Sequence, residues 1–238
     1  MACILAIETC TGNCSVALCI DGSVAAIAES REEHAHSTLL TLFVGQVLGT
    51  SDLDIRDLDA VAVSRGPGSY TGLRIGVSVA KGICYGIDKP FIAVDTLQAM
   101  TAFLIDSQAF LQLQCRDNND LWFCPMIDAR RMEVYSGLYN RNLEIKRKVI
   151  AEIIGQQSYE NYLSDRQIVF FGNGAEKCKE IIIHRNAFFV SDILPSAAGM
   201  AKLSEEKFNV SDFENIAYFE PFYLKDFIAK KPVKNLLK

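Results

Sequence analysis

The order of predicted strands occurs twice along the chain, and this repeat constrains the fold more than any other feature. The first copy has three apolar runs of strand length, with a turn at Asp21-Gly22 before the third: residues 4–8, 15–20 and 24–28. About 120 residues later the plan returns as two runs and a turn: residues 123–128, 133–138 and 140–142. The repeat predicts two structurally similar halves.

Helical patterns alternate with further strands after each copy. In the first half, two helices flank a buried strand: residues 36–48, 60–63 and 70–85. In the second half, a strand at 168–171 is followed by an apolar pattern at 174–184 that predicts a helix. Antiparallel strands that lead into β-α-β units, twice over, predict a duplicated α/β fold with two halves of the β-β-β-α-β-α type.

The helix predicted from residue 70 is rich in glycine. Its segment contains Gly72, Gly76, Gly82 and Gly86. Glycine in a helix interior costs about 1 kcal/mol relative to alanine, so a structural reason for these residues is required. Gly72, Gly76 and Ala80 follow one another at i+4 and form a strip without bulky side chains. We expect another helix to approach this strip closely.

The turn before this helix, Gly66-Pro67-Gly68, allows two further interpretations besides close helix packing. The glycines can serve only a tight turn, with Ser69 or Thr71 capping the helix. Backbone N–H groups at a helix start can also bind phosphate. However, the segment lacks the Gly-Lys-Ser/Thr end of a P-loop and the Gly-x-Gly-x-x-Gly fingerprint. Phosphate binding is therefore the least favoured of the three.

Four motifs resemble those of the bacterial TsaB (YeaZ) proteins. The longest is Ser-Arg-Gly-Pro-Gly-Ser-Tyr-Thr-Gly-Leu-Arg-Ile-Gly at 64–76, and the others lie at 5–9, 36–40 and 220–224. They span almost the whole chain, although the catalytic paralogue TsaD carries a motif similar to the first. The resemblance implies membership of the machinery that makes threonylcarbamoyladenosine beside the anticodon of certain tRNAs. In that machinery, TsaB-like chains are a non-catalytic partner of TsaD.

The resemblance also implies a fold group and a division into halves. TsaB proteins belong to the actin, Hsp70 and sugar-kinase (ASKHA) group, whose duplicated α/β plan agrees with the repeat. We expect a first half at 1–105 and a second, smaller half at 106–211. The C-terminal segment 212–238 is expected to pack back on the first half. The polar run at 116–120 predicts an exposed linker.

Proteins of this fold group bind ATP between their halves, but only one phosphate turn of this chain has suitable residues. The turn at 8–15 can present N–H groups and hydroxyls to phosphate. Its counterpart after Asp128 is Ala129-Arg130-Arg131, where close backbone approach to phosphate would require glycine. Gly172-Asn173-Gly174 can flank an adenosine or simply form a turn after a strand. We therefore predict no cofactor bound to the isolated chain.

Patterns for metal binding and nucleophilic catalysis are missing from the sequence. His34 and His36 are two residues apart, so on a helix they would point to nearly opposite sides, unlike ligands at i,i+4. His184 follows an apolar segment, so we predict that it lies on the surface. Ser64 and Ser69 have neither a Gly-x-Ser-x-Gly elbow nor a neighbouring base. We predict no metal site and no catalytic residue.

Composition predicts a cytoplasmic protein that meets tRNA only through a partner. A formal charge of −5 disfavours an autonomous nucleic-acid binder. The N-terminus lacks a basic signal-peptide region, and charged residues interrupt the apolar runs, which disfavours a membrane span. No two of the eight cysteines form a Cys-x-x-Cys pair, so we predict that they are buried and pack as small hydrophobic residues. The basic segment 225–238 predicts a solvated tail rather than a tRNA contact.

The helix at 36–48 is apolar around most of its circumference and so needs cover on two sides. The sheet covers one side; the other is covered by a second helix of this chain or by another subunit. We predict a helical interface about a two-fold or pseudo-two-fold axis, formed by Leu40, Phe43, Val44, Val47, Gly72, Leu73, Gly76, Val77 and Ala80. The predicted partners are a TsaD-like paralogue and a TsaE-like ATPase, with a homodimer through the same helices as an alternative.

These observations predict an accessory subunit that binds and supports a TsaD-like threonylcarbamoyltransferase without catalytic activity of its own. The main alternative is an independent ATP-dependent phosphotransferase or ATPase of the same fold. A glycoprotease-like metallopeptidase is less favoured, because neither its metal ligands nor its nucleophile are recognisable in the sequence.

Overall fold

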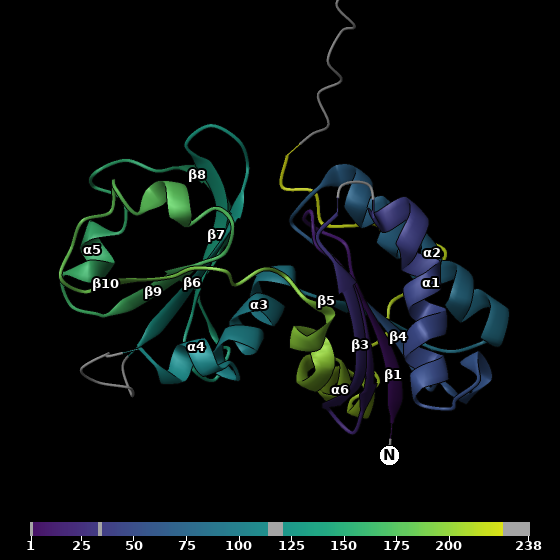
Figure 1. Ribbon diagram of the computed structural model, residues 1–238. Coiled ribbons are helices and arrows are strands. Elements are labelled where there is room, and N and C mark those ends of the chain that lie inside the picture. Colours follow the sequence, from purple (N-terminus) through teal and green to yellow (C-terminus); the bar gives the residue numbers. More distant parts are fainter. Residues whose placement is uncertain (1, 33–34, 114–120, 226–238) are drawn as a thin grey trace, which may run out of the picture.

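The computed structural model describes residues 2–32, 35–113 and 121–225, which form two five-stranded sheets (Figure 1). The first sheet has the order β3-β2-β1-β4-β5, with β1 (Cys3–Glu8), β2 (Cys14–Ile20), β3 (Ser23–Ser30), β4 (Ala60–Ser64) and β5 (Phe91–Val94). The second has the order β10-β9-β6-β7-β8, with β6 (Trp122–Asp128), β7 (Glu133–Tyr139), β8 (Ile145–Ile153), β9 (Ile168–Phe171) and β10 (Ala187–Val190). When the second sheet is read from β8 to β10, the two orders match: β3, β2, β1, β4 and β5 correspond to β8, β7, β6, β9 and β10.

Pairing directions repeat along with the strand order. β1 pairs antiparallel with β2 and parallel with β4, and β6 pairs antiparallel with β7 and parallel with β9. The predicted strands all lie within observed ones. The prediction of a duplicated α/β fold is confirmed.

Helices are long in the first half of the chain and short in the second. α1 (Ala35–Thr50), the 3-10 helix η1 (Ile55–Asp57) and α2 (Tyr70–Ile87) precede β5. They are followed by α3 (Thr96–Ile105) and α4 (Gln108–Leu111). Between β8 and β10 of the second sheet come α5 (Glu160–Leu163) and the 3-10 helix η2 (Glu176–Cys178). After β10 come the 3-10 helix η3 (Ala197–Met200) and α6 (Ala201–Asn209).

The helix predicted at 174–184 is wrong, because the structure has only η2 and turns there. Gly172 has a φ of +101°, and a Cβ on Gly174 would lie 2.9 Å from the carbonyl carbon of Ile127. The two glycines therefore form a tight turn against β6. The three consecutive isoleucines at 181–183 are β-branched, which further disfavours a helix.

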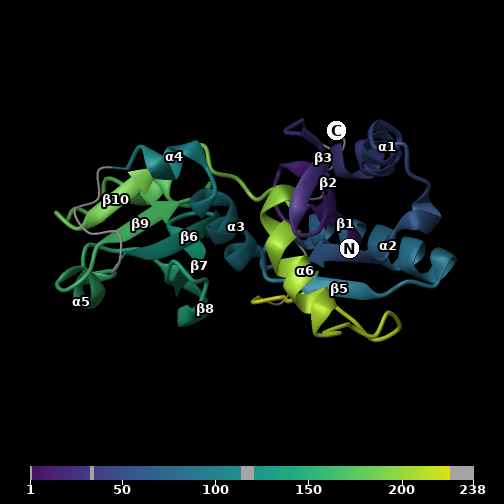
Figure 2. The same ribbon diagram turned by 90° about the horizontal axis from the view of Figure 1, so that it is seen from below.

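Both faces of the central strands β1 and β4 are buried, so these strands are apolar at nearly every position. Alternate residues of a strand point to opposite faces. Leu5 and Ile7 of β1 belong to the core under α1 and α2, whereas Ile4 and Ala6 belong to the core that contains residues of α3, η3 and α6. The sheet thus lies between two helical layers (Figures 1 and 2).

α3 packs on both halves of the molecule. Its small residues, Ala99 and Ala102, join the core of the first sheet. Its larger residues, Leu97, Met100 and Leu104, join the core of the second sheet. Figure 2 shows α3 between the two sheets. The two halves are therefore joined by a packed helix.

The chain returns to the first half before residue 212. η3 and α6 contact strands of the first sheet, and alanines at 197 and 201 lie buried there. Further along, Ile216 and Phe219 pack against the core beneath α1 and α2. The limits of the two halves, 1–105 and 106–211, stay a prediction, and the expected linker at 116–120 and the tail at 226–238 lie outside the described residues.

Candidate functional site

The turn at 9–13, between β1 and β2, is closed by the chain itself. The Ser69 N–H donates to the Cys10 carbonyl oxygen at 2.6 Å, and a Cβ on Gly68 would lie 2.3 Å from the same oxygen. Every residue of the turn except Gly12 is buried. The backbone that could face a phosphate therefore contacts the turn before α2. This arrangement favours the tight-turn interpretation of Gly68 over phosphate binding.

Glu8 ends β1 as a fully buried carboxyl group. Its Oε1 accepts hydrogen bonds from the Cys10 N–H at 2.6 Å and the Ser64 hydroxyl at 2.7 Å. Its Oε2 has no hydrogen-bond partner among the described residues. Burial raises the pKa of Glu8, and these hydrogen bonds oppose that shift without cancelling it. The group is enclosed by protein and is not exposed to a substrate.

The counterpart turn at 129–132 is braced by a lysine. The Lys177 ammonium pairs with the Asp128 carboxylate and donates to the carbonyl oxygens of Arg131 at 2.6 Å and Glu133 at 2.7 Å. Arg130 and Arg131 both have positive φ. The turn thus presents carbonyl oxygens to the protein's own cation, which disfavours phosphate binding by its backbone.

Gly172 and Asn173 pack β9 against β6. A Cβ on Gly172 would lie 2.3 Å from the Met126 carbonyl oxygen, and Asn173 Oδ1 accepts from the Asp128 N–H at 3.0 Å. A cavity of about 380 Å³ beside them is also lined by Glu176 and Asp192. The close packing of Gly172 on Met126 and the hydrogen bond between Asn173 and Asp128 support the strand-to-turn interpretation of these residues.

The glycine strip of α2 faces inward, so the prediction that another helix packs on it is wrong. A Cβ on Gly72 would lie 2.1 Å from the Thr9 carbonyl oxygen, and one on Gly76 would lie 2.2 Å from Thr9 Oγ1. Ala80, the third residue of the strip, is fully buried. The close approach is between α2 and the end of β1, within one chain. Ser69 caps this helix, because its Oγ accepts from the Gly72 N–H at 3.2 Å.

Most other predicted interface residues also face the core. Phe43 alone is half-buried, at the margin of the core under α1 and α2. α1 and α2 do lie in contact with each other, but their predicted faces are turned toward the sheets, where burying apolar surface stabilises the fold. The residues buried in this way are Leu40, Val44, Val47, Leu73 and Val77.

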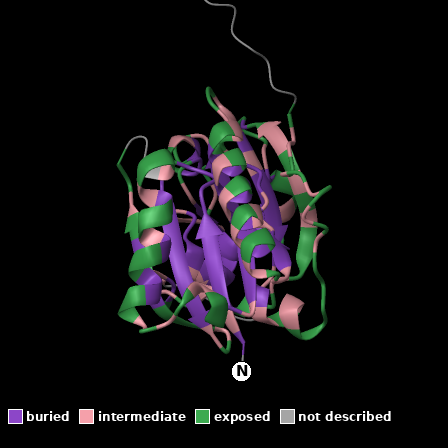
Figure 3. Ribbon diagram, turned by 90° about the vertical axis from the view of Figure 1, so that its right-hand side faces the viewer, coloured by how far each residue is buried: buried purple, intermediate pink, exposed green. Residues whose placement is uncertain are grey.

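The outward face of α1 and α2 is the candidate site. Leu42 on α1 is 64% exposed and Tyr85 on α2 is 85% exposed. Figure 3 shows both helices in front of the buried strands, with exposed outer sides. Four glycines lie beside the two exposed side chains, and within the described ranges no atom beyond the adjacent turns of their own helix lies within 4 Å of a Cβ built on them: Gly45, Gly49, Gly82 and Gly86. These six residues are called the docking face below.

The docking face has the composition of a helix-packing surface. Large apolar side chains next to residues without side chains allow a second helix to approach closely. The sequence did contain a signal for it, since the pairs Gly45/Gly49 and Gly82/Gly86 have the same i+4 spacing as Gly72/Gly76. Spacing alone did not show which glycines face inward.

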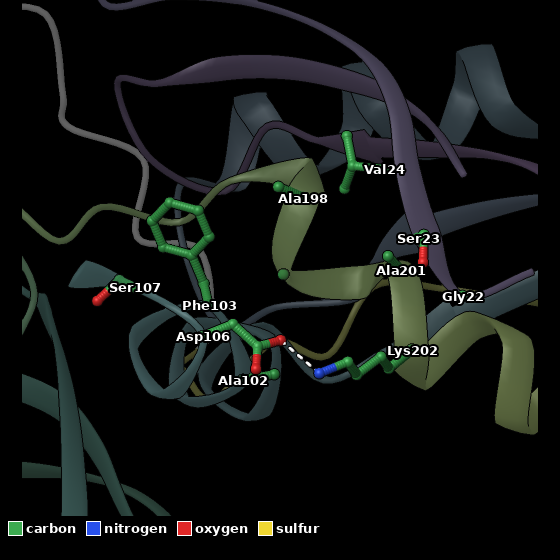
Figure 4. A pocket seen from close by; sticks show the side chains of 11 residues that line it. Gly22, Ser23, Val24, Ala102, Phe103, Asp106, Ser107, Ala198, Ala201 and Lys202 are labelled. Atoms are coloured by element: carbon green, nitrogen blue, oxygen red, sulfur yellow. Dashed lines mark hydrogen bonds and ion pairs between the residues drawn. The ribbon is translucent and has the colours of Figure 1, made fainter. Parts of the chain in front are cut away.

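A second cavity, of about 390 Å³, lies where the β2–β3 turn, α3 and the η3–α6 segment meet (Figure 4). Val24 and Phe103 line it on opposite sides, and Lys202 Nζ pairs with Asp106 at 2.6 Å. Sequence reasoning did not predict a site there. Within residues 2–32, 35–113 and 121–225, no three His, Cys, Asp or Glu side chains form a group that could hold a metal ion, and no helix is long and apolar enough to cross a membrane.

The cysteines contribute to packing. Burial raises the pKa of the Cys124 thiol to about 12, and thiols with raised pKa values are poor nucleophiles. Cys3 is half-buried, and Cys115 lies outside the described residues. The prediction of small buried hydrophobes is confirmed for Cys10, Cys14, Cys19, Cys84, Cys124 and Cys178.

Comparison with known proteins finds relatives along nearly the whole chain. A family model described as TsaD, tRNA N6-adenosine threonylcarbamoyltransferase, matches residues 26–233. The Escherichia coli tRNA threonylcarbamoyladenosine biosynthesis protein TsaB is 31% identical, over 96% of each chain. The Haemophilus influenzae protein of the same description is 28% identical, over 96% of this chain and 95% of that one.

A solved structure shares the fold over its whole length. This Pseudomonas aeruginosa protein, described as similar to peptidase YEAZ, superimposes with a TM-score of 0.80 at 23% identity, over 94% of this chain and 100% of that one. Both sequence relatives are described as TsaB and match nearly the whole chain, and the motif at 64–76 resembles that of TsaB proteins. The chain belongs to the TsaB family.

Proposed function

We propose that this chain is a non-catalytic subunit in tRNA threonylcarbamoyladenosine biosynthesis, which binds and supports a TsaD-like threonylcarbamoyltransferase. The name of the Escherichia coli relative supports the pathway. The absence of catalytic activity is supported by the enclosed Glu8 carboxyl and by the turn at 9–13, which would have to open before an ATP phosphate could reach its backbone. The turn at 129–132 presents carbonyl oxygens to Lys177 instead.

The observation that carries this proposal is the docking face. Leu42 and Tyr85 leave large apolar surfaces in water on two adjacent helices, and four glycines next to them leave room for another helix. Covering such a surface is favourable, at about 25 cal/mol per Å² of apolar area. Helices α1 and α2 are therefore the proposed contact with the TsaD-like subunit.

Further partners follow from the same proposal. A second copy of this chain would use the same face, so a homodimer and the TsaD-like subunit would compete for it. A TsaE-like ATPase would supply nucleotide chemistry that this chain lacks. The net charge of −5 supports contact with tRNA through the complex. The cytoplasm is the proposed compartment, because tRNA modification takes place there.

Leu42→Asp tests the proposal, since it places a charge in the middle of the docking face. Leu42 is largely exposed, so the variant should melt at the wild-type temperature. We expect its affinity for the purified TsaD-like paralogue to fall about tenfold or more, as measured by calorimetry. Threonylcarbamoyladenosine formation by the reconstituted machinery should fall in parallel.

Ile183→Asp is the matched control, because Ile183 is 84% exposed but lies in the second half, away from the docking face. It should bind and support the transferase like the wild type. Equal affinities for the two aspartate variants would contradict the proposed contact. ATP turnover by the purified chain alone would contradict the absence of catalytic activity and favour the phosphotransferase alternative.

A further inference from the structure

Arg74 lies on the docking side of α2, near the N-terminal end of the helix. Together with Ser78, Gly82 and Tyr85 it forms an exposed row at spacings of four, four and three residues. These residues therefore share one face of the helix. A subunit that covers Gly82 and Tyr85 would also reach Arg74.

Two tyrosines hold the Arg74 side chain in place. Its guanidinium lies 4.4 Å from the centroid of the Tyr70 ring, and its Nε donates to the Tyr223 hydroxyl at 3.4 Å. The two rings lie 5.0 Å apart. An arginine stacked and hydrogen-bonded in this way loses less side-chain entropy on binding than a free one.

Tyr223 is itself fixed by the C-terminal strap, residues 213–225. The Phe222 N–H donates to the Arg65 carbonyl oxygen at 2.7 Å, beside the turn that opens α2. Lys81 of α2 donates to the Phe219 carbonyl oxygen at 2.7 Å. The strap thus runs along α2 and places the second tyrosine against Arg74.

The charge of Arg74 is not neutralised by an ion pair in the described part of the chain. Arg65 pairs with Asp95 at 2.9 Å, and Arg147 pairs with Glu152 at 2.6 Å. The Glu220 carboxylate attracts the Arg74 guanidinium electrostatically but forms no ion pair with it. Arg74 is exposed, so its terminal N–H groups can donate to a further acceptor.

We infer that Arg74 is the charged anchor of the docking face and binds a carboxylate of the docked subunit. The guanidinium fork matches a carboxylate with two parallel hydrogen bonds. Arginine held by aromatic neighbours is typical of residues that dominate the binding energy of protein interfaces. Tyr70 and Tyr223 act as positioning residues. The inference rests on the proposed function, because the carboxylate belongs to the TsaD-like subunit.

The test measures binding of the full-length chain to the TsaD-like paralogue at low and moderate salt. Arg74→Ala should weaken binding about tenfold, which corresponds to about 1.4 kcal/mol. The wild-type affinity should fall more steeply than that of the variant between about 50 and 300 mM NaCl, because salt screens the ion pair that only the wild type forms. Arg74→Lys keeps the charge without the planar fork and should give an intermediate affinity.

Arg166→Ala is the matched control. Arg166 lies 4.9 Å over the Trp122 ring in the second half, so it has the same cation–π arrangement away from the docking face. It should bind the paralogue like the wild type. Tyr223→Ala should weaken binding, whereas Tyr223→Phe, which retains the ring, should restore most of the affinity.

The outcomes separate this inference from the proposed function. If the wild type binds the paralogue, and Arg74→Ala and Arg166→Ala bind it with the same affinity and the same salt dependence, Arg74 is not an anchor. The docking face itself would be retained. Loss of binding on Arg74→Ala without any change in salt slope would overturn the carboxylate as its partner. A wild-type chain that does not bind the paralogue would overturn both proposals.

Discussion

Replacing Gly72 with alanine should destabilise the folded chain, although alanine is the better helix former. The added Cβ would lie 2.1 Å from the Thr9 carbonyl oxygen, whereas ordinary contacts begin at 3.4 Å. α2 and the end of β1 must therefore separate by about 1.3 Å, the difference between these two distances. Because the opposing atom is backbone in a buried turn, no rotamer change can relieve the overlap.

The magnitude follows from two opposing effects. Overpacking of a buried contact costs about 1–3 kcal/mol, and a clash with backbone belongs at the upper end of that range. The helix propensity of alanine offsets about 1 kcal/mol of this cost. A net loss of about 2 kcal/mol should lower the melting temperature by about 4–8 °C in a chain of this size.

Gly82→Ala is the control for this prediction. Gly82 lies in the same helix, and in the described structure no atom beyond the adjacent turns of that helix lies within 4 Å of a Cβ placed there. Only the propensity gain applies, so the melting temperature should rise by about 2–4 °C. Thermal unfolding followed by circular dichroism measures both variants. A Gly72→Ala chain as stable as Gly82→Ala would refute the close approach of α2 to β1.

Two further substitutions test buried charge. Burial raises the pKa of Glu8 above its ordinary value of 4.5, so the stability that this group contributes is full at low pH and lost as the pH rises through the folded pKa. Glu8→Gln should therefore raise the melting temperature at about pH 8 more than at about pH 5; a pH-independent difference would argue against a raised pKa. Arg147→Ala leaves the Glu152 carboxylate, 19% exposed, without its cation. Urea titration should show a loss of about 3 kcal/mol, and a loss no larger than that of Arg166→Ala would contradict a structural role for the pair.

Most strands could be located because their signals are local, although β8 and β10 were not predicted. Alternating apolar runs and turns such as Asp21-Gly22 set each strand, and the repeat fixed the plan of both halves. The sequence wrongly predicted a helix at 174–184, because the apolar pattern of these residues comes from turns packed under the second sheet. There Cys178 and Ile182 are buried without a regular helix between them.

The predicted interface residues lie on the two helices of the proposed docking face, but mostly on their buried sides. The i+4 spacing of Gly72 and Gly76 correctly indicates that something approaches the helix closely, but it does not identify the approaching group. That group is Thr9, more than sixty residues earlier in the chain. α1 is apolar on both sides, so its periodicity did not distinguish buried Val44 from exposed Leu42. Only the folded chain separates these faces.

The position of η3 and α6 in the sequence has a consequence for biosynthesis. Both segments contact the first sheet, yet the ribosome makes them only after the whole second sheet. Until then, the face formed by Ala6, Ala17 and Ala62 lacks part of its cover. A nascent chain that stops before residue 196 would expose this surface, so the first half completes its fold last although its strands are translated first.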